Sequence, residues 1–288
     1  MNVAIFAGPT IDAAAVTAAI DAVVLPPVRQ GDVYRVVEAH SPRMIGIVDG
    51  YFHQVPSVWH KEILWALSRG VAVFGSASMG ALRAAELAPF GMVGVGVVYE
   101  AYRDARFPPY EDAFEDDDEV AVMHGPAELG YPAVSEALVN IRATLDRAAR
   151  ESVIDAVQRD ALKDLARSTY YADRSWESLL QAAQGAGLAC PCDRLRASAR
   201  RRARESQAAR CRGHDRGDEI RHGLDAAAAG VPFRADRPMA ADGRRHPCPR
   251  GSCEPGARGT RPSRRRLCRL PSPRGAAAAG PAFTRARR

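Results

Sequence analysis

A serine with small neighbours joins an apolar run to a helical pattern in residues 74–83, Phe-Gly-Ser-Ala-Ser-Met-Gly-Ala-Leu-Arg. Where a buried strand runs directly into a helix at a serine, the sharp turn exposes the hydroxyl and the following amides form part of an oxyanion hole. The sequence around Ser78 predicts such a nucleophile turn, although Ser76 stands where the usual motif has its first glycine. The alternative role of Ser78 is to cap the helix that begins at Met79.

A nucleophilic serine requires a base, and three histidines are candidates for it. His60 lies on the polar side of a predicted helix, His53 lies in the loop before that helix, and His124 follows an apolar run at 120–123. Together with Asp49, at the end of a predicted strand, they form a candidate acid/base cluster, with His60 as the favoured base. For each histidine, an ordinary surface or core position is the alternative.

Charged residues near the serine have two interpretations each. Arg83 lies about one helical turn beyond Ser78, where it could hold an anionic substrate group near the helix N-terminus. Arg83 and Glu86 are three residues apart on one helix, so an ordinary surface pair is the alternative. The acidic run at 115–119 could bind Mg²⁺ or a basic partner, or it could be a solvated loop.

The elements that must position these residues alternate between short β-branched runs and helical patterns, which is typical of βα units on a mainly parallel sheet. The sequence therefore predicts an α/β fold with flanking helices in Rossmann-like layers, followed by a helical C-terminal part. Strands are predicted at 3–6, 22–25, 44–48, 71–74 and 93–99, with a further apparent strand at 120–123. Helices are predicted at 11–21, 56–69, 79–88, 135–150, 152–167 and 174–184, the first of them capped by Thr10.

In open sheets of this kind, ligands bind beyond the carboxyl ends of the strands. The loops after the first, third and fourth strands carry the polar residues, so we expect their side chains to converge within roughly 10 Å at that edge. The predicted site consists of Thr10, Asp49, His53, His60, Ser78 and Arg83.

The composition changes near residue 189. Residues 189–288 contain 25 Arg, no Lys and 9 acidic residues, whereas residues 1–188 carry a net charge of −10. A segment rich in Arg, Ala, Pro and Gly cannot bury enough apolar area to offset the entropy of ordering its backbone. We therefore predict one α/β domain at 1–185 and a disordered low-complexity tail at 186–288.

Arginine without lysine is what a GC-rich gene gives when translated out of frame, so a shifted reading frame from about residue 188 is our first hypothesis for the tail. The alternative is a cationic nucleic-acid-binding arm, which the absence of interleaved aromatic residues disfavours. The cysteines and histidines of the tail show no zinc-ligand spacing, and no metal site is predicted.

Other classes are disfavoured by what the sequence lacks. No apolar run approaches the roughly 20 residues of a membrane span, and residues 1–3 have no basic segment of a signal peptide, so we expect a cytoplasmic protein. The Gly-Pro-Thr at 8–10 is not a G-x-G-x-x-G motif, and there is no Walker A segment, so a nucleotide-binding function is disfavoured.

Six segments, in this order along residues 1–185, resemble the signature of TfuA-like proteins. They are Val-Asp-Gly-Tyr-Phe at 48–52, Pro-Ser-Val-Trp-His-Lys-Glu-Ile-Leu at 56–64, Ala-Ser-Met-Gly-Ala-Leu-Arg-Ala-Ala-Glu-Leu at 77–87, Phe-Gly-Met-Val-Gly at 90–94, Asp-Asp-Glu-Val-Ala-Val-Met-His at 117–124 and Ser-Glu-Ala-Leu-Val-Asn-Ile-Arg at 135–142. The resemblance stops where the composition changes, and the last helical stretch of the family is not matched.

The resemblance implies a role in making ribosomally synthesised, modified peptides. TfuA-like proteins act beside a YcaO-domain enzyme that uses ATP to activate a backbone amide, and the pair installs a thioamide in a precursor peptide. The TfuA-like partner hydrolyses a thiocarboxylated, ubiquitin-like sulfur carrier to deliver sulfide, and it needs no cofactor of its own. A non-catalytic adaptor that docks the YcaO enzyme, the carrier and the peptide is the alternative.

The resemblance also implies site residues, through their places in the matching segments. The expected catalytic residues are Ser78, His60, Lys61, Glu62 and Asp49. The expected substrate-binding residues within the matching segments are Arg83, Glu86 and His124. Thr10, His53 and Ser76 lie outside these segments and are expected to bind substrate because of their places in the loops at the sheet edge.

Overall fold

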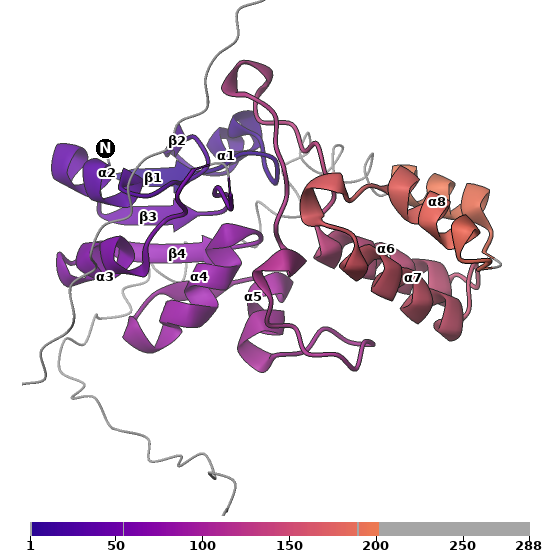
Figure 1. Cartoon of the computed structure of the whole chain (residues 1–288). Coiled ribbons are helices and arrows are strands. Elements are labelled where there is room, and N and C mark those ends of the chain that lie inside the picture. Colours follow the sequence, from indigo (N-terminus) through magenta and orange to yellow (C-terminus); the bar gives the residue numbers. More distant parts are fainter. Residues whose placement is uncertain (1, 54, 189, 202–288) are drawn as a thin grey trace, which may run out of the picture. The chain divides into compact units, whose positions relative to one another are not determined.

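The computed structural model describes residues 2–53, 55–188 and 190–201, all within the first of the two units of the chain, Met1–Asp236. Five parallel strands form one sheet in the order β2-β1-β3-β4-β5 (Figure 1). They are β1 (Val3–Phe6), β2 (Val23–Leu25), β3 (Met44–Ile47), β4 (Ala72–Ser76) and β5 (Val93–Val95). The predicted α/β class with a mainly parallel sheet is confirmed.

Helices cover both faces of the sheet because the strands alternate two sets of apolar side chains. Helix α1 (Ala13–Ala19) packs on the face that carries Ile5 and Val48. The opposite face, which carries Phe6 and Ile47, packs against α2 (Asp32–His40), α3 (His60–Ser68) and α4 (Met79–Leu87). Since successive strand residues point to opposite faces, this alternation fixes the register of each strand.

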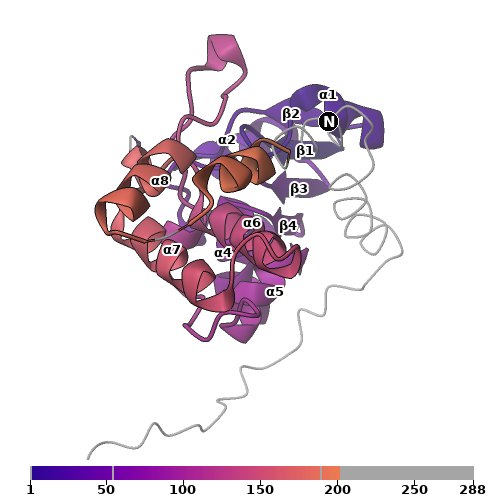
Figure 2. The same cartoon turned by 90° about the vertical axis from the view of Figure 1, so that its right-hand side faces the viewer.

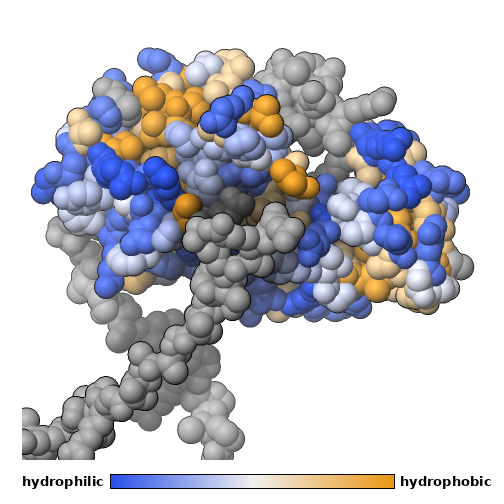
Figure 3. Space-filling view, turned by 45° about the horizontal axis from the view of Figure 1, so that its top comes forward, coloured by the Kyte–Doolittle hydropathy of each residue, from blue (hydrophilic) through white to orange (hydrophobic). Residues whose placement is uncertain are grey.

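The C-terminal half is helical. It contains α5 (Val97–Asp104), α6 (Leu138–Arg150), α7 (Ala156–Ser168) and α8 (Trp176–Gly185). Helix α5 packs beside α4, whereas α7 lies between α6 and α8 (Figures 1 and 2). These last three helices enclose a core of their own, in which Leu138, Leu145 and Leu162 are buried. On the face that Figure 3 shows, hydrophobic residues form several separate patches among hydrophilic ones.

Several predicted boundaries are wrong for local reasons. The first helix begins at Ala13 and is capped by Asp12, because the side chain of Thr10 is hydrogen-bonded to Asp49 instead. Helix α2, which was not predicted, lies between the second and third strands. The helix expected at 56–69 begins only at His60.

Two predicted strands also need correction. The strand expected at 93–99 ends at Val95, because the left-handed Gly96 (φ 91°) leads directly into α5. Residues 120–123 do not form a strand: they follow a short 3₁₀ turn, Asp117–Glu119, and lead to an isolated antiparallel bridge between His124 and Ala133. Apolar character alone made this segment resemble a strand.

Packed structure continues past residue 185, the domain boundary predicted from composition. Residues 192–201 are helical, and Leu195 is buried in the core of the helical part. Residues 202–288, to which most of the predicted disorder, the shifted frame and the nucleic-acid alternative refer, lie outside the described residues. For the described residues, no helix is both long enough and apolar enough to span a membrane.

Two glycines allow α4 to approach the sheet closely. A Cβ atom on Gly80 would lie 1.8 Å from the carbonyl oxygen of Ile47, and one on Gly75 would lie 2.1 Å from the carbonyl oxygen of Gly80. The Gly80 amide donates a 3.1 Å hydrogen bond to Val48. Strand β3, strand β4 and the start of α4 are thus in backbone contact at the point where the chain passes Ser78.

We therefore expect Gly80→Ala to lower the free energy of unfolding by more than about 3 kcal/mol, at the upper end of overpacking costs, because the clash is with backbone atoms that cannot rotate away. Gly185→Ala is the matched control: nothing lies within 4 Å of its added Cβ, and helical Gly→Ala replacements raise stability by up to about 1 kcal/mol. Urea unfolding followed by circular dichroism measures both. Equal stability of Gly80→Ala and the wild type would contradict the close approach.

Candidate functional site

Asp49 lies just after β3 and is hydrogen-bonded to the loop that follows β1. Its carboxylate accepts hydrogen bonds from the amides of Gly8 (2.8 Å) and Thr10 (3.1 Å) and from the Thr10 hydroxyl (2.6 Å). The side chain is 1% exposed. Burial raises the pKa of Asp49, and the hydrogen bonds from Thr10 oppose that rise. Thr10 and Asp49, both expected at the carboxyl edge of the sheet, are therefore in direct contact.

An aromatic group lies beside Asp49. The ring of His124 packs edge-on against Tyr51, with centroids 4.6 Å apart, and against Tyr131, with centroids 5.8 Å apart. The charge of His124 favours the ionised form of Asp49. Tyr51 and Tyr131 were not predicted, although Tyr51 stands only two residues after Asp49 and would have been a reasonable candidate.

The turn at Ser78 has the predicted strand–turn–helix form, but its geometry differs from a simple nucleophile elbow. The residue with a left-handed backbone is Ala77 (φ 61°), one position earlier. Ser78 occupies the N-cap position of α4 without a capping hydrogen bond from its side chain. Its hydroxyl is buried and donates to the carbonyl of Val120 at 3.3 Å. Neither the exposed hydroxyl nor the helix cap is what the structure shows.

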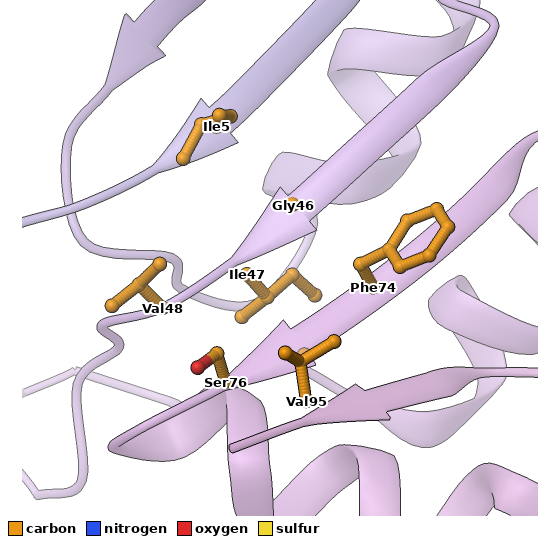
Figure 4. A pocket seen from close by; sticks show the side chains of 8 residues that line it. Ile5, Gly46, Ile47, Val48, Phe74, Ser76 and Val95 are labelled. Atoms are coloured by element: carbon orange, nitrogen blue, oxygen red, sulfur yellow. The ribbon is translucent and has the colours of Figure 1, made fainter. Parts of the chain in front are cut away.

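A small pocket opens at the carboxyl end of β3 and β4 (Figure 4). Its walls are mainly apolar, and the hydroxyl of Ser76 is the polar side-chain group among its lining residues. The cavity volume of about 20 Å³ is enough for roughly one water molecule. The pocket is therefore a feature of the sheet edge and too small for a peptide or cofactor.

A second polar group joins α3 to α4. Nε2 of His60 lies 2.8 Å from Oε2 of Glu86, and Arg83 donates to the same oxygen at 2.6 Å. Arg83 also donates to the carbonyl of Val58. The pair predicted between Arg83 and Glu86 is present, and His60 completes a partly exposed cluster of three polar side chains. Within the described residues, this cluster makes no hydrogen bond to the Ser78 side chain, whose hydroxyl donates to Val120 instead.

The neighbours of His60 differ in what they contact. The carboxylate of Glu62 accepts hydrogen bonds from the amides of Gly31, Val33 and Trp59, so it holds the start of α2 and of α3. Lys61 is exposed. The catalytic roles expected of both stay predictions, and the contacts of Glu62 already give it a structural role.

His53 contacts the helical part of the chain. Its ring stacks on Tyr171, with centroids 5.1 Å apart, and meets Tyr170 edge-on at 6.3 Å. The hydroxyl of Tyr171 donates to the sulfur of Met123 at 3.7 Å. His53 thus links the loop after β3 to the segment that leads to His124.

The acidic run at 115–119 is bound within the chain itself. Glu119 is 1% exposed and accepts two hydrogen bonds from the buried Arg142, at 2.5 and 2.9 Å. Asp118 accepts a 2.6 Å hydrogen bond from Arg174, and Asp116 pairs with Arg167. The interpretation as a solvated loop fits Glu115, Asp116 and Asp117, which are exposed, but not the buried Glu119. Binding of Mg²⁺ or of a basic partner by this run stays a prediction.

The structure thus arranges the expected residues in two groups. Asp49, Thr10 and His124 form the first, at the carboxyl ends of β1 and β3, and the turn at Ser78 is linked to it through the 120–124 segment. His60, Arg83 and Glu86 form the second, between α3 and α4. The functional roles predicted for all of them stay predictions.

The fold and these groups define an open parallel α/β protein of 2-1-3-4-5 strand order whose polar residues gather at the carboxyl edge. Residues 49–175 match the family model described as TfuA-like protein, which confirms the resemblance found in the sequence. The matched segment begins at Asp49 and contains every site residue named above except Thr10. The match is consistent with an accessory role beside a YcaO-type enzyme. A comparison with curated proteins gave no match.

The hydrogen bond from Thr10 to Asp49 predicts a pH-dependent stability effect. Since the folded-state pKa of Asp49 lies above its unfolded value, ionisation costs the folded protein stability as pH rises through these values. Thr10→Val removes an opposing hydrogen bond, so it raises this pKa further. We expect a loss of about 1.5–3 kcal/mol at pH 7, the usual range for a hydrogen bond to a charged group, and a smaller loss near pH 4.

Urea unfolding at the two pH values measures this difference. Thr17→Val is the matched control, because the exposed Thr17 hydroxyl donates only to carbonyls of its own helix. Its small effect should be the same at both pH values. A loss in Thr10→Val that does not change with pH would contradict the assigned role of Asp49.

Proposed function

We propose that this chain is an accessory protein of peptide backbone thioamidation, acting beside a YcaO-domain enzyme. It hydrolyses a thiocarboxylated, ubiquitin-like sulfur carrier and so delivers sulfide for the modification of a ribosomal precursor peptide, while the YcaO enzyme uses the ATP. The observation that supports this proposal best is the turn at Ser78, which is joined to the Asp49 group at the carboxyl edge and lies within the TfuA-like segment.

Breaking an acyl–sulfur bond requires stabilisation of the negative charge that develops on the carbonyl oxygen. The first amides of a helix lack partners inside the helix. At the start of α4, the Gly80 amide is taken by Val48, whereas no acceptor for the amides of Ser78 and Met79 is found among the described residues. These two donors, at the positive end of the α4 dipole, support an oxyanion site.

The contact of the Ser78 hydroxyl separates two possible roles of this residue. As a nucleophile, the hydroxyl must first leave the Val120 carbonyl. As an oxyanion-site residue, Ser78 acts through its backbone amide, and the side chain does not move. The buried hydroxyl also favours the second candidate function, a non-catalytic adaptor that binds the YcaO enzyme and the carrier. In that case the partly exposed cluster of His60, Arg83 and Glu86 would serve as a docking surface.

Sulfide release distinguishes the two functions. The wild type should release sulfide from a thiocarboxylated carrier, and Ser78→Ala should lower the single-turnover rate by about 10²-fold if the hydroxyl is the nucleophile. Carrier binding, measured separately by calorimetry, should change little. Ser68→Ala is the control, because the exposed Ser68 hydroxyl donates to a carbonyl of its own helix.

The other outcomes are equally informative. Full activity in Ser78→Ala would restrict the serine to its backbone role and leave an activated water as the nucleophile. Binding of the carrier without any release of sulfide by the wild type would support the adaptor.

A further inference from the structure

The strand order creates a topological switch point between β1 and β3. Strands β1 and β3 are neighbours, yet the chain leaves β1 towards β2 on one side and β3 towards β4 on the other. The connecting helices α1 and α3 lie on opposite faces. Ligands of doubly wound sheets bind in the crevice that forms beyond the carboxyl ends at such a switch point. In this chain the residues there are Asp49, Thr10 and the loop that continues to Tyr51.

His124 reaches this point from a distant part of the sequence. The bridge between His124 and Ala133 and the hydrogen bond from the Gly125 amide to Pro132 hold its backbone in a narrow loop. Tyr131 has a left-handed backbone (φ 57°), which is uncommon for an aromatic residue and marks a position that the surrounding structure imposes. The loop thereby places the imidazole in edge-on contact with the rings of Tyr51 and Tyr131.

The imidazole is partly exposed and bound only weakly. The only hydrogen bond recorded for it in the described part of the chain joins Nδ1 to the carbonyl of Gly125 at 3.4 Å. Nε2 has no recorded partner there. The rings of two tyrosines contact the imidazole, and their phenol groups are hydrogen-bond donors at neutral pH.

His60 is bound quite differently. Its Nε2 lies 2.8 Å from Glu86, which comes eight residues after Ser78 in the sequence, or about 12 Å along the helix axis at 1.5 Å per residue. The segment that ends at His124, in contrast, contacts Ser78 directly through the Val120 carbonyl. Of the two histidines, His124 is therefore the one connected to both Asp49 and the Ser78 turn.

We propose that His124 carries the proton in the hydrolysis of the carrier thiocarboxylate, with Tyr51 and Tyr131 holding the thiocarboxylate beside it. This inference rests on the proposed function. The imidazole takes a proton from the attacking water as the new carbon–oxygen bond forms. It returns this proton to sulfur as the carbon–sulfur bond breaks and the electron pair leaves with sulfur. The thiocarboxylate and water thus give a carboxylic acid and hydrosulfide, with no oxidant or reductant.

The test is single-turnover sulfide release from a thiocarboxylated ubiquitin-like carrier, measured between pH 5 and 9. We expect His124→Gln to lower the rate by about 10²-fold, the usual contribution of a general acid or base. We also expect it to remove one ionisation step from the pH profile of the wild type, because glutamine cannot exchange a proton. His40→Gln is the matched control, because His40 is an exposed histidine at the end of α2.

Tyr131→Phe is the second variant, since it removes one hydroxyl from a surface loop and leaves the packing of the ring intact. It should raise the Michaelis constant for the carrier without removing the ionisation step from the pH profile. Tyr34→Phe, at an exposed tyrosine of α2, is its control. Urea unfolding establishes that each variant is folded before its rate is compared.

The outcomes separate this inference from the function on which it rests. A wild type that releases no sulfide contradicts the proposed function and the role of His124 together. Sulfide release by the wild type with an unchanged rate and pH profile in folded His124→Gln overturns only the present inference. An equal loss in His40→Gln overturns it as well, because the effect would then not be specific to this position.

Discussion

The buried guanidinium of Arg142 holds the loop after α5 against the helical part of the chain. Arg142 is fully buried on α6, donates two hydrogen bonds to Glu119 and two to Asp112, and lies 5.0 Å from the ring centre of Tyr110. Asp112 is shared with Lys163 and Arg167 of α7. The hydrogen bonds from Arg142 hold the pKa of Asp112 well below its usual range. The acidic loop is thereby fixed to two helices that have a core of their own.

The position of the candidate site depends on this interaction. Val120, whose carbonyl accepts the Ser78 hydroxyl, directly follows Glu119, and His124 comes five residues after Glu119. Arg174 strengthens the connection, because it binds both the carboxylate and the carbonyl of Asp118. A buried ion pair adds little net stability, since the desolvation of its charges offsets their attraction. Its contribution here is to position the segment, and the removal of one partner leaves a buried charge uncompensated.

The sheet could be predicted from sequence because each strand is a short apolar run between turn residues. Gly75 and Gly80 also indicated a tight turn around Ser78, and the structure gives the reason in the backbone contacts of both glycines. Helix α2 was missed because its N-terminus is fixed by Glu62 from α3, a contact that no local pattern reveals. Short-range signals thus account for the strands and the turn.

The candidate site could be predicted only in part, because some of its residues are positioned by contacts between distant parts of the sequence. Asp49 and Thr10 follow neighbouring parallel strands, so topology alone brings them together. His124 and Tyr131 arrive on a loop whose course depends on Arg142, which pairs with Glu119 across 23 positions of sequence. The acidic run at 115–119 resembled a surface loop because its partners, Arg142, Arg167 and Arg174, lie on later elements. Long-range charge pairing is invisible to patterns of hydropathy and spacing.

The central claim is that Arg142 positions the loop that carries His124. It is tested most directly by measuring the nuclear Overhauser effect between the rings of Tyr51 and His124 in Arg142→Met. Amide exchange in β1, β3 and β4 reports in the same sample that the sheet remains folded. If Arg142 positions the loop, the ring contact seen in the wild type should disappear while the amides of the sheet stay protected. A ring contact of unchanged intensity in a folded Arg142→Met protein would contradict the account.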